Sequence, residues 1–252
     1  MGGDLVSLRM LVVAAARPEQ ELWRQGAGMV SVPIDFVAQD AASATGTIAN
    51  GDTDICVLDG ALPDAFKTAV VTAARAANPA PLVFVSTTRG SPRLEGANGM
   101  LAKPVTAEDA RKLVEICVRT KIPTRVLIVD DSGTMRSIVR KILSASRFAL
   151  AIQEASEGIA ALNELRAGNF GLVFLDYNMP GLNGFETLSE IKRENPNIAV
   201  VMMTSTVDNA IADRAHASGA LAFLKKPFYP ADIDAVLERY YCVSLPANGA
   251  NA

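Results

Sequence analysis

The 252-residue sequence lacks several features that mark common functional classes. It has no cluster of basic residues, since 12 lysines and arginines accompany 13 acidic residues up to Lys121 and 12 accompany 14 after it. A nucleic-acid-binding surface is therefore not expected. The sequence also shows no signal peptide and no apolar run of membrane-spanning length. We therefore expect a cytoplasmic protein that does not contact a membrane.

Cysteine is also scarce. The three cysteines, Cys56, Cys117 and Cys242, lie far apart and match neither a disulfide framework nor the spacing of a metal site. An odd number of cysteines without a disulfide pattern is typical of a reducing cytoplasm. Cys56 falls inside an apolar run, where it is interpreted as a small buried residue.

Short hydrophobic runs, in contrast, are plentiful and occur twice in the same order. The first half contains MLVVAAA, DICVLDG, PLVFVST and GMLAKP, and the second half contains RVLIVDD, GLVFLDY, AVVMMTS and LAFLKKP. Segments with helical periodicity separate these runs, such as GTMRSIVRKILSAS and GFETLSEIKREN. Apolar strands that alternate with helices predict a parallel sheet covered on both faces. We therefore expect two doubly wound α/β domains.

The boundary between the two domains is predicted in the segment VRTKIPTRV, because Pro123 cannot continue the preceding helix. The expected domains are residues 1–121 and residues 122–252, the second ending in a short tail. No DNA-binding or enzymatic output domain is expected after Tyr241, so any output would depend on contacts with other proteins.

Three aspartates stand where predicted strands end. Asp130 and Asp131 follow the run RVLIV, and Asp176 follows the run GLVFL. Right-handed crossovers would bring these two strand ends together, at the edge where doubly wound sheets bind ligands. Three adjacent carboxylates would raise the pKa of at least one of them unless a cation compensates. A hard divalent ion fits such oxygen ligands, and we expect Mg²⁺.

A hydroxyl and an ammonium group are predicted at the same edge. Thr204 directly follows the run AVVMM, and Lys226 is predicted to end the strand LAFLKK. These two groups suit the oxygens of an incoming phosphoryl group, which need donors and a compensating charge. Asp176 would be the acceptor and would form an aspartyl phosphate. Helix capping by Asp130 would not explain the other groups at matching strand ends.

Four motifs in the second half resemble the receiver domain of two-component response regulators, particularly the stand-alone chemotaxis type. They are VDDSGTMRSIVRKIL, FLDYNMPGLNGFE, MMTS and FLKKPF, in receiver order and spacing, and the resemblance covers residues 122 to 242. It implies a flavodoxin-like (βα)5 fold with a central five-stranded parallel sheet in each half.

The resemblance also implies a role for each site residue. Asp176 would be the phosphoacceptor, and the Mg²⁺ ligands would be Asp130, Asp131, Asp176 and the backbone carbonyl of Asn178. Thr204 would be the switch hydroxyl, and Phe223 the aromatic residue that swings inward. The cation that pairs with the phosphoryl group would be Lys226 rather than Lys225, because Lys226 directly precedes Pro227.

The first half is similar to a receiver that has lost part of this site. The alignment places Ala14 and Ala15 at the metal-binding positions, whereas Asp59, Ser86 and Lys103 match the acceptor, the hydroxyl and the cation. We therefore expect a pseudo-receiver that is phosphorylated little or not at all, in which Asp59 and Lys103 form a buried pair.

Two further departures separate the halves. Met100 stands at the position of Phe223, so the aromatic switch is absent from the first half. Ser86 and Lys103 are 17 residues apart, against 22 for Thr204 and Lys226, which predicts a shortened or missing fourth helix. The first half is expected to serve docking or regulation.

The resemblance implies a signalling protein rather than an enzyme. A sensor histidine kinase or histidine phosphotransfer protein would phosphorylate Asp176, and a downstream protein would bind the altered surface. The only histidine, His216, lies in a predicted helix and is not expected to be a phosphotransfer site. Dimerisation on phosphorylation is left open.

Several alternatives stay open at this point. The same chemistry would serve a phosphate shuttle or sink in a phosphorelay, or a tandem-receiver fragment of a hybrid histidine kinase. A metal-dependent phosphatase with an aspartyl nucleophile is disfavoured, because it needs an aspartate where this chain has Asn178. The first half could also bind a small ligand through Arg89 or Arg93.

Overall fold

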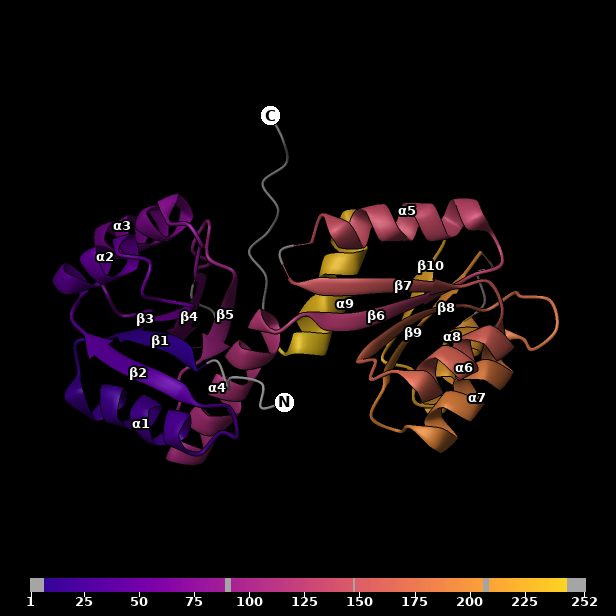
Figure 1. Ribbon diagram of the computed structural model, residues 1–252, viewed down its shortest axis with the longest axis horizontal. Helices are drawn as coiled ribbons and strands as arrows, with labels where there is room; N and C mark the ends of the chain where they lie inside the picture. Colours follow the sequence, from indigo (N-terminus) through magenta and orange to yellow (C-terminus); the bar gives the residue numbers. More distant parts are fainter. Residues whose placement is uncertain (1–6, 89–91, 147, 206–208, 244–252) are drawn as a thin grey trace, which may run out of the picture. The chain divides into compact units, whose positions relative to one another are not determined.

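The computed structural model describes residues 7–88, 92–146, 148–205 and 209–243 and divides into two compact units (Figure 1). Among the described residues, the first unit comprises residues 7–122 and 241–243, and the second unit is Pro123–Tyr240. The tail predicted after Val243 lies outside the described residues. None of the described helices combines the length and apolar character needed to cross a membrane.

The first unit alternates strands and helices. Its elements are β1 (Leu8–Val13), α1 (Arg17–Gly28), β2 (Ile34–Gln39), α2 (Ala41–Ala49), β3 (Ile55–Asp59), α3 (Asp64–Ala76), β4 (Leu82–Thr87), β5 (Gly99–Ala102) and α4 (Ala107–Lys121). All strand pairs are parallel, in the order β2-β1-β3-β4-β5.

The second unit repeats this plan. Its elements are β6 (Thr124–Val129), α5 (Gly133–Ser144), β7 (Leu150–Ala155), α6 (Gly158–Ala167), β8 (Leu172–Asp176), α7 (Gly184–Glu194), β9 (Ala199–Thr204), α8 (Asn209–Ala217), β10 (Ala222–Lys225) and α9 (Pro230–Tyr241). The strand order β7-β6-β8-β9-β10 matches that of the first unit, and all pairs are again parallel. The predicted pair of doubly wound five-stranded folds is confirmed.

Helices cover both faces of each sheet. In the first unit α1 packs against α4 on one face, and α2 packs against α3 on the other. In the second unit α5 and α9 lie on one face, and α6, α7 and α8 lie on the other (Figure 1). The central strands β3 and β8 are consequently buried along their whole length, as their uninterrupted apolar sequences predict.

The two units differ between their fourth and fifth strands. In the second unit α8 lies between β9 and β10, whereas residues 88 and 92–98 of the first unit form no helix. Leu94 packs on the core of the first unit there, and Ala97 is buried. The absence of this helix from the described residues agrees with the shorter spacing in the sequence. Residues 89–91, including Arg89, lie outside the described residues.

A glycine permits the close approach of α1 and α4. A Cβ added at Gly26 would lie 2.6 Å from the carbonyl carbon of Ala110 and 2.6 Å from the nitrogen of Arg111. Trp23, one turn earlier in α1, is fully buried. Two residues later, a Cβ at Gly28 would meet nothing within 4 Å.

Replacing Gly26 by alanine should therefore lower the free energy of unfolding of the first unit by about 1–3 kcal/mol, because α1 and α4 must separate. Gly28→Ala, in the same helix, should be neutral or slightly stabilising, since alanine favours helix over glycine. Urea unfolding followed by the fluorescence of Trp23, the only tryptophan, measures both variants. Equal stability of the two variants would contradict this account of the packing.

Candidate phosphoryl-acceptor site

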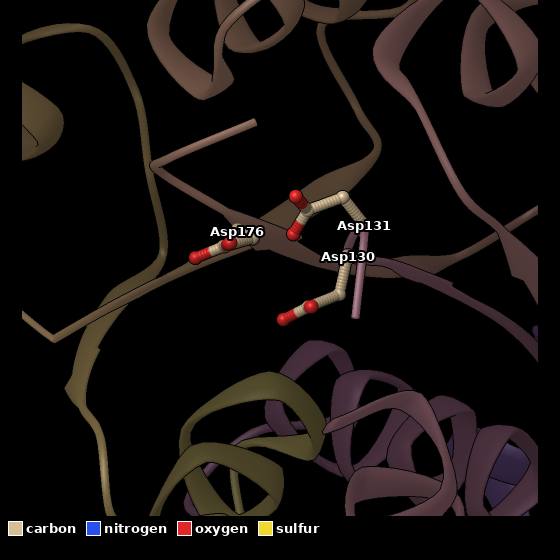
Figure 2. Close-up of side chains that lie close together, drawn as sticks. All are labelled: Asp130, Asp131 and Asp176. Atoms are coloured by element: carbon tan, nitrogen blue, oxygen red, sulfur yellow. The ribbon is translucent and has the colours of Figure 1, made fainter. Parts of the chain in front are cut away.

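The three aspartates singled out in the sequence meet at one edge of the second sheet. Asp130 and Asp131 directly follow β6, and Asp176 is the last residue of the adjacent strand β8. One carboxylate oxygen from each lies within 4.8 Å of the others. Figure 2 shows the three side chains converging from these two strand ends. The parallel sheet thus brings together residues that are 46 positions apart in the chain.

Two of these carboxylates are removed from solvent. Asp130 is fully buried and Asp176 is 4% exposed, whereas Asp131 is exposed. A buried carboxylate is costly unless it is paired and hydrogen-bonded. The Asp130 Oδ1 atom accepts a hydrogen bond from the backbone nitrogen of Ser132 at 2.9 Å, at the beginning of α5.

Lys226 supplies the compensating charge. Its Nζ donates to Asp130 Oδ2 at 2.7 Å and lies 2.9 Å from Asp176 Oδ1. Its side chain is 14% exposed, whereas the neighbouring Lys225 is exposed. The strand β10 ends at Lys225, one residue earlier than the sequence predicted, and the geometry supports the choice of Lys226.

The titration of the pair reflects burial and mutual attraction. Burial raises the pKa of Asp176 above its ordinary value, and the hydrogen bond from Lys226 only partly offsets this. Burial acts to lower the pKa of Lys226, but its hydrogen bonds to Asp130 and Asp176 outweigh that effect and raise it.

The donor set fits a hard divalent cation. With all groups ionised, three carboxylates and one ammonium leave a charge of −2, and every potential ligand atom is an oxygen. Mg²⁺ retains several waters and needs only one or two carboxylates, so the solvent-facing side of Asp131 suits it. Asp130, Asp131, Asp176 and the exposed Asn178, through its backbone carbonyl, are the residues that would hold it.

The predicted switch residues lie on the two strands beyond β8. Thr204, the last residue of β9, is fully buried, and its carbonyl accepts from the backbone nitrogen of Lys226 at 2.7 Å. Phe223, on β10, is partly buried and packs against the core of the second unit. The end of β9 is therefore joined directly to the lysine that contacts the carboxylates.

A groove beside the cluster was not anticipated from the sequence. It has a volume of about 560 Å³. The Arg214 guanidinium lies 4.4 Å from the ring centroid of Phe185, and Tyr177 meets the same ring edge-on at 5.6 Å. Its lining residues are Asp131, Tyr177, Asn178, Met179, Pro180, Asn183, Phe185, Glu186 and Arg214. They belong to separate elements, so no local motif identified the groove.

The first unit places three of its five predicted site residues together. Asp59 ends β3, Ser86 pairs with it in register on β4, and Lys103 follows β5. Lys103 Nζ donates to Asp59 Oδ1 at 3.0 Å, so the two residues pair as expected, but only Asp59 is buried, since the Lys103 side chain is 35% exposed. Ala14 and Ala15 follow β1 and offer no ligand atoms, so this donor set does not fit the Mg²⁺ site of the second unit.

One acid of the first unit was missed. Glu19, in the first turn of α1, has a side chain that is only 7% exposed, and its Oε2 lies 2.7 Å from Lys103 Nζ. Burial raises the pKa of Glu19, and its contact with Lys103 offsets this only in part. In the sequence, an acid just after Pro18 resembles an ordinary first-turn residue that favours the helix dipole.

The remaining predicted features of the first unit are peripheral. Met100 occupies on β5 the place that Phe223 has on β10, the second residue of the strand, and is half-buried. Arg93, named as a ligand-binding candidate, is exposed, and its companion Arg89 lies outside the described residues.

Comparison with known proteins agrees with these observations. The family described as Response regulator receiver domain matches residues 126–238. Chemotaxis protein CheY-3 of Vibrio cholerae serotype O1 is 34% identical over 119 residues, which cover 46% of this chain and 91% of that protein. Chemotaxis protein CheY of Thermotoga maritima is 30% identical over 115 residues, which cover 46% and 95%.

A solved structure extends the similarity to both units. The crystal structure of a two-component system response regulator/GGDEF domain protein covers 93% of this chain and 98% of its own, with a TM-score of 0.55 and 22% identity. At that identity the similarity concerns the fold alone.

Because burial raises the pKa of Asp176, its ionisation opposes folding when no divalent ion is present. The penalty is absent at pH values below the pKa of the unfolded carboxyl and grows as the pH rises. Asp176→Asn should therefore raise the free energy of unfolding by roughly 1 kcal/mol at pH 7 with EDTA, and the gain should disappear below about pH 4.

Urea unfolding followed by circular dichroism at several pH values measures this effect. Asp213→Asn, which removes an exposed acid of α8, is the control and should change little. A loss of stability in Asp176→Asn at pH 7 would contradict the inferred electrostatic balance.

Proposed function

The chain belongs to the response regulator receiver family, and on that premise we propose that a histidine kinase or histidine phosphotransfer protein phosphorylates Asp176 in its second unit. The observation that carries the proposal is the convergence of three carboxylates within 4.8 Å, two of which share the ammonium group of Lys226. Such an arrangement provides what phosphoryl transfer needs, which is positioning and charge compensation.

The transfer is a displacement at phosphorus. A carboxylate oxygen of Asp176 attacks the phosphorus of the donor phosphohistidine, and the P–N bond breaks with its electrons passing to the imidazole nitrogen. Contact with Lys226 favours the ionised carboxylate that must attack. Asp130, Asp131, Asp176 and the Asn178 carbonyl would hold Mg²⁺, which would supply positive charge to the phosphoryl oxygens. Lys226 then pairs with those oxygens in place of the carboxylate.

The signal leaves the site through Thr204 and Phe223. The Thr204 hydroxyl moves toward the new phosphoryl group, and Phe223, now partly buried against the core, turns further inward. The surface formed by α8, β10 and α9 changes as a result and alters affinity for a downstream protein. Output by protein contact, without DNA binding, is part of the proposal, as is a cytoplasmic location.

The first unit is a pseudo-receiver in this proposal and serves docking or regulation. It keeps Asp59, Ser86 and Lys103 but has alanine at both metal-binding positions. A shuttle or sink role in a phosphorelay is the main alternative, and it differs in requiring a short-lived aspartyl phosphate and a second histidine protein as acceptor. Hydrolysis of external substrates is disfavoured because Asn178 stands where aspartyl phosphatases need an acid.

Incubation with acetyl phosphate and Mg²⁺ should add one phosphoryl group per chain, detected by intact-protein mass spectrometry. Asp176→Asn should abolish the label, because the attacking carboxylate is lost, and EDTA should do the same. The matched variant Asp59→Asn, at the equivalent strand end of the first unit, should keep the full label. A label that persists in Asp176→Asn and disappears in Asp59→Asn would reverse the assignment of the two units.

Asp131→Asn should weaken Mg²⁺ binding by at least roughly tenfold, because it removes an exposed ligand that contributes little to folding. The rate of labelling at subsaturating Mg²⁺ should fall in parallel. Calorimetric titration measures the affinity, with Asp213→Asn as the control for loss of one negative charge. Wild-type affinity in Asp131→Asn would exclude this residue from the metal site.

A further inference from the structure

Glu19 is a buried carboxylate of the first unit for which the second unit has no counterpart. It lies six residues after the end of β1, and the same offset from the end of β6 gives Met135. The helix dipole would stabilise an acid in the first turn of α1 by only about 0.3–1 kcal/mol, and it would do so for an exposed side chain too. Burial of Glu19 therefore needs another reason.

That reason is Lys103, which the first unit shares between two carboxylates. Its Nζ lies 2.7 Å from Glu19 Oε2 and 3.0 Å from Asp59 Oδ1. In the second unit, Lys226 Nζ lies 2.7 Å from Asp130 and 2.9 Å from Asp176. The first unit has Ala14 at the position of Asp130, so the lysine has no carboxylate partner there. Glu19 supplies that second carboxylate instead, from a helix rather than from a strand end.

The replacement restores the partner of the lysine without restoring a metal site. Two carboxylates and one ammonium leave a charge of −1, against −2 in the second unit. Within the described ranges, Asp130, Asp131 and Asp176 form the only group of three or more potential ligands. A divalent ion at Asp59 would have to compete with Lys103 for both carboxylates.

The charged neighbours of Glu19 are Lys103, which attracts its carboxylate, and Asp59, whose carboxylate raises the pKa of Glu19. The second oxygen of Glu19, Oε1, is buried and has no hydrogen-bond partner among the described residues, and the same holds for the hydroxyl of Ser86. Removing the Glu19 charge should therefore release Lys103 without breaking a larger network of hydrogen bonds.

We propose that Glu19 closes the first-unit site to phosphorylation, because its carboxylate holds the ammonium of Lys103 that a phosphoryl group on Asp59 would need. Asp130 contacts Lys226 at the same distance, but a bound Mg²⁺ would take Asp130 as a ligand and free that ammonium, whereas Glu19 stands outside the metal-binding positions. The loss of the metal ligands and the gain of Glu19 are then two separate barriers. Restoring an acid after β1 would not suffice while Glu19 is present. This inference rests on the phosphoacceptor role proposed for the equivalent Asp176.

The test uses the full chain with Asp176→Asn, so that any label falls on the first unit. Ala15→Asp restores one acid at an exposed position, where aspartate should not disturb folding. This variant is compared with and without Glu19→Gln during incubation with acetyl phosphate and Mg²⁺. In the reaction, an Asp59 oxygen attacks phosphorus, and acetate leaves with the electrons of the broken P–O bond.

We expect Glu19→Gln to increase the Mg²⁺-dependent label of the Ala15→Asp chain at least tenfold, with the label mapping to Asp59. Glu21→Gln, which changes an exposed acid of the same helix, should have no such effect. Equal labelling with and without Glu19→Gln, at any level, overturns the proposal. Trp23 fluorescence in urea verifies that every variant is folded.

The wild-type chain separates this result from the broader proposal. If wild-type protein takes up its label at Asp176 and the two Ala15→Asp chains are equal, only the role of Glu19 fails. If wild-type protein takes up no label, the proposed function itself fails.

Discussion

Each unit depends on one ammonium group that two largely buried carboxylates share at the carboxyl edge of a parallel sheet. Lys226 contacts Asp130 and Asp176 in the second unit, and Lys103 contacts Glu19 and Asp59 in the first. Each lysine keeps one carboxylate partner when the other is removed, whereas removal of the lysine would leave both carboxylates without a compensating charge and cost about 3–5 kcal/mol. The parallel topology gathers Asp59, Asp130, Asp176 and the two lysines at the carboxyl edges of the sheets, whereas Glu19 reaches Lys103 from helix α1.

The two units show how one framework can carry different electrostatics. In the second, the exposed Asp131 adds a negative charge beyond what the lysine balances, so a divalent cation has a place. In the first, Ala15 removes that charge, and Glu19 supplies the second partner of the lysine from α1. The fold is retained in both because the core depends on apolar strands and helix packing rather than on the site.

Much of the fold could be predicted because its signals are local. The central strands are continuous apolar runs, and predicted helices such as residues 133–146 and 184–195 agree with α5 and α7 to within two residues. The edge strands β2 and β7 were not singled out, because they bury only alternate side chains and carry a weaker apolar signal. The spacing of Ser86 and Lys103 predicted a shortened or missing helix after β4, and the described residues there form none.

The sequence by itself determined which side chains stand at the strand ends of the second unit, namely Asp130, Asp131, Asp176, Thr204 and Lys226. Parallel strands place such ends together whatever the details of packing. Only the tertiary structure decided that Glu19 contacts Lys103, and that Tyr177, Phe185 and Arg214 line one groove. These contacts join helices and loops whose relative rotation depends on the packed core, and no local pattern encodes that rotation.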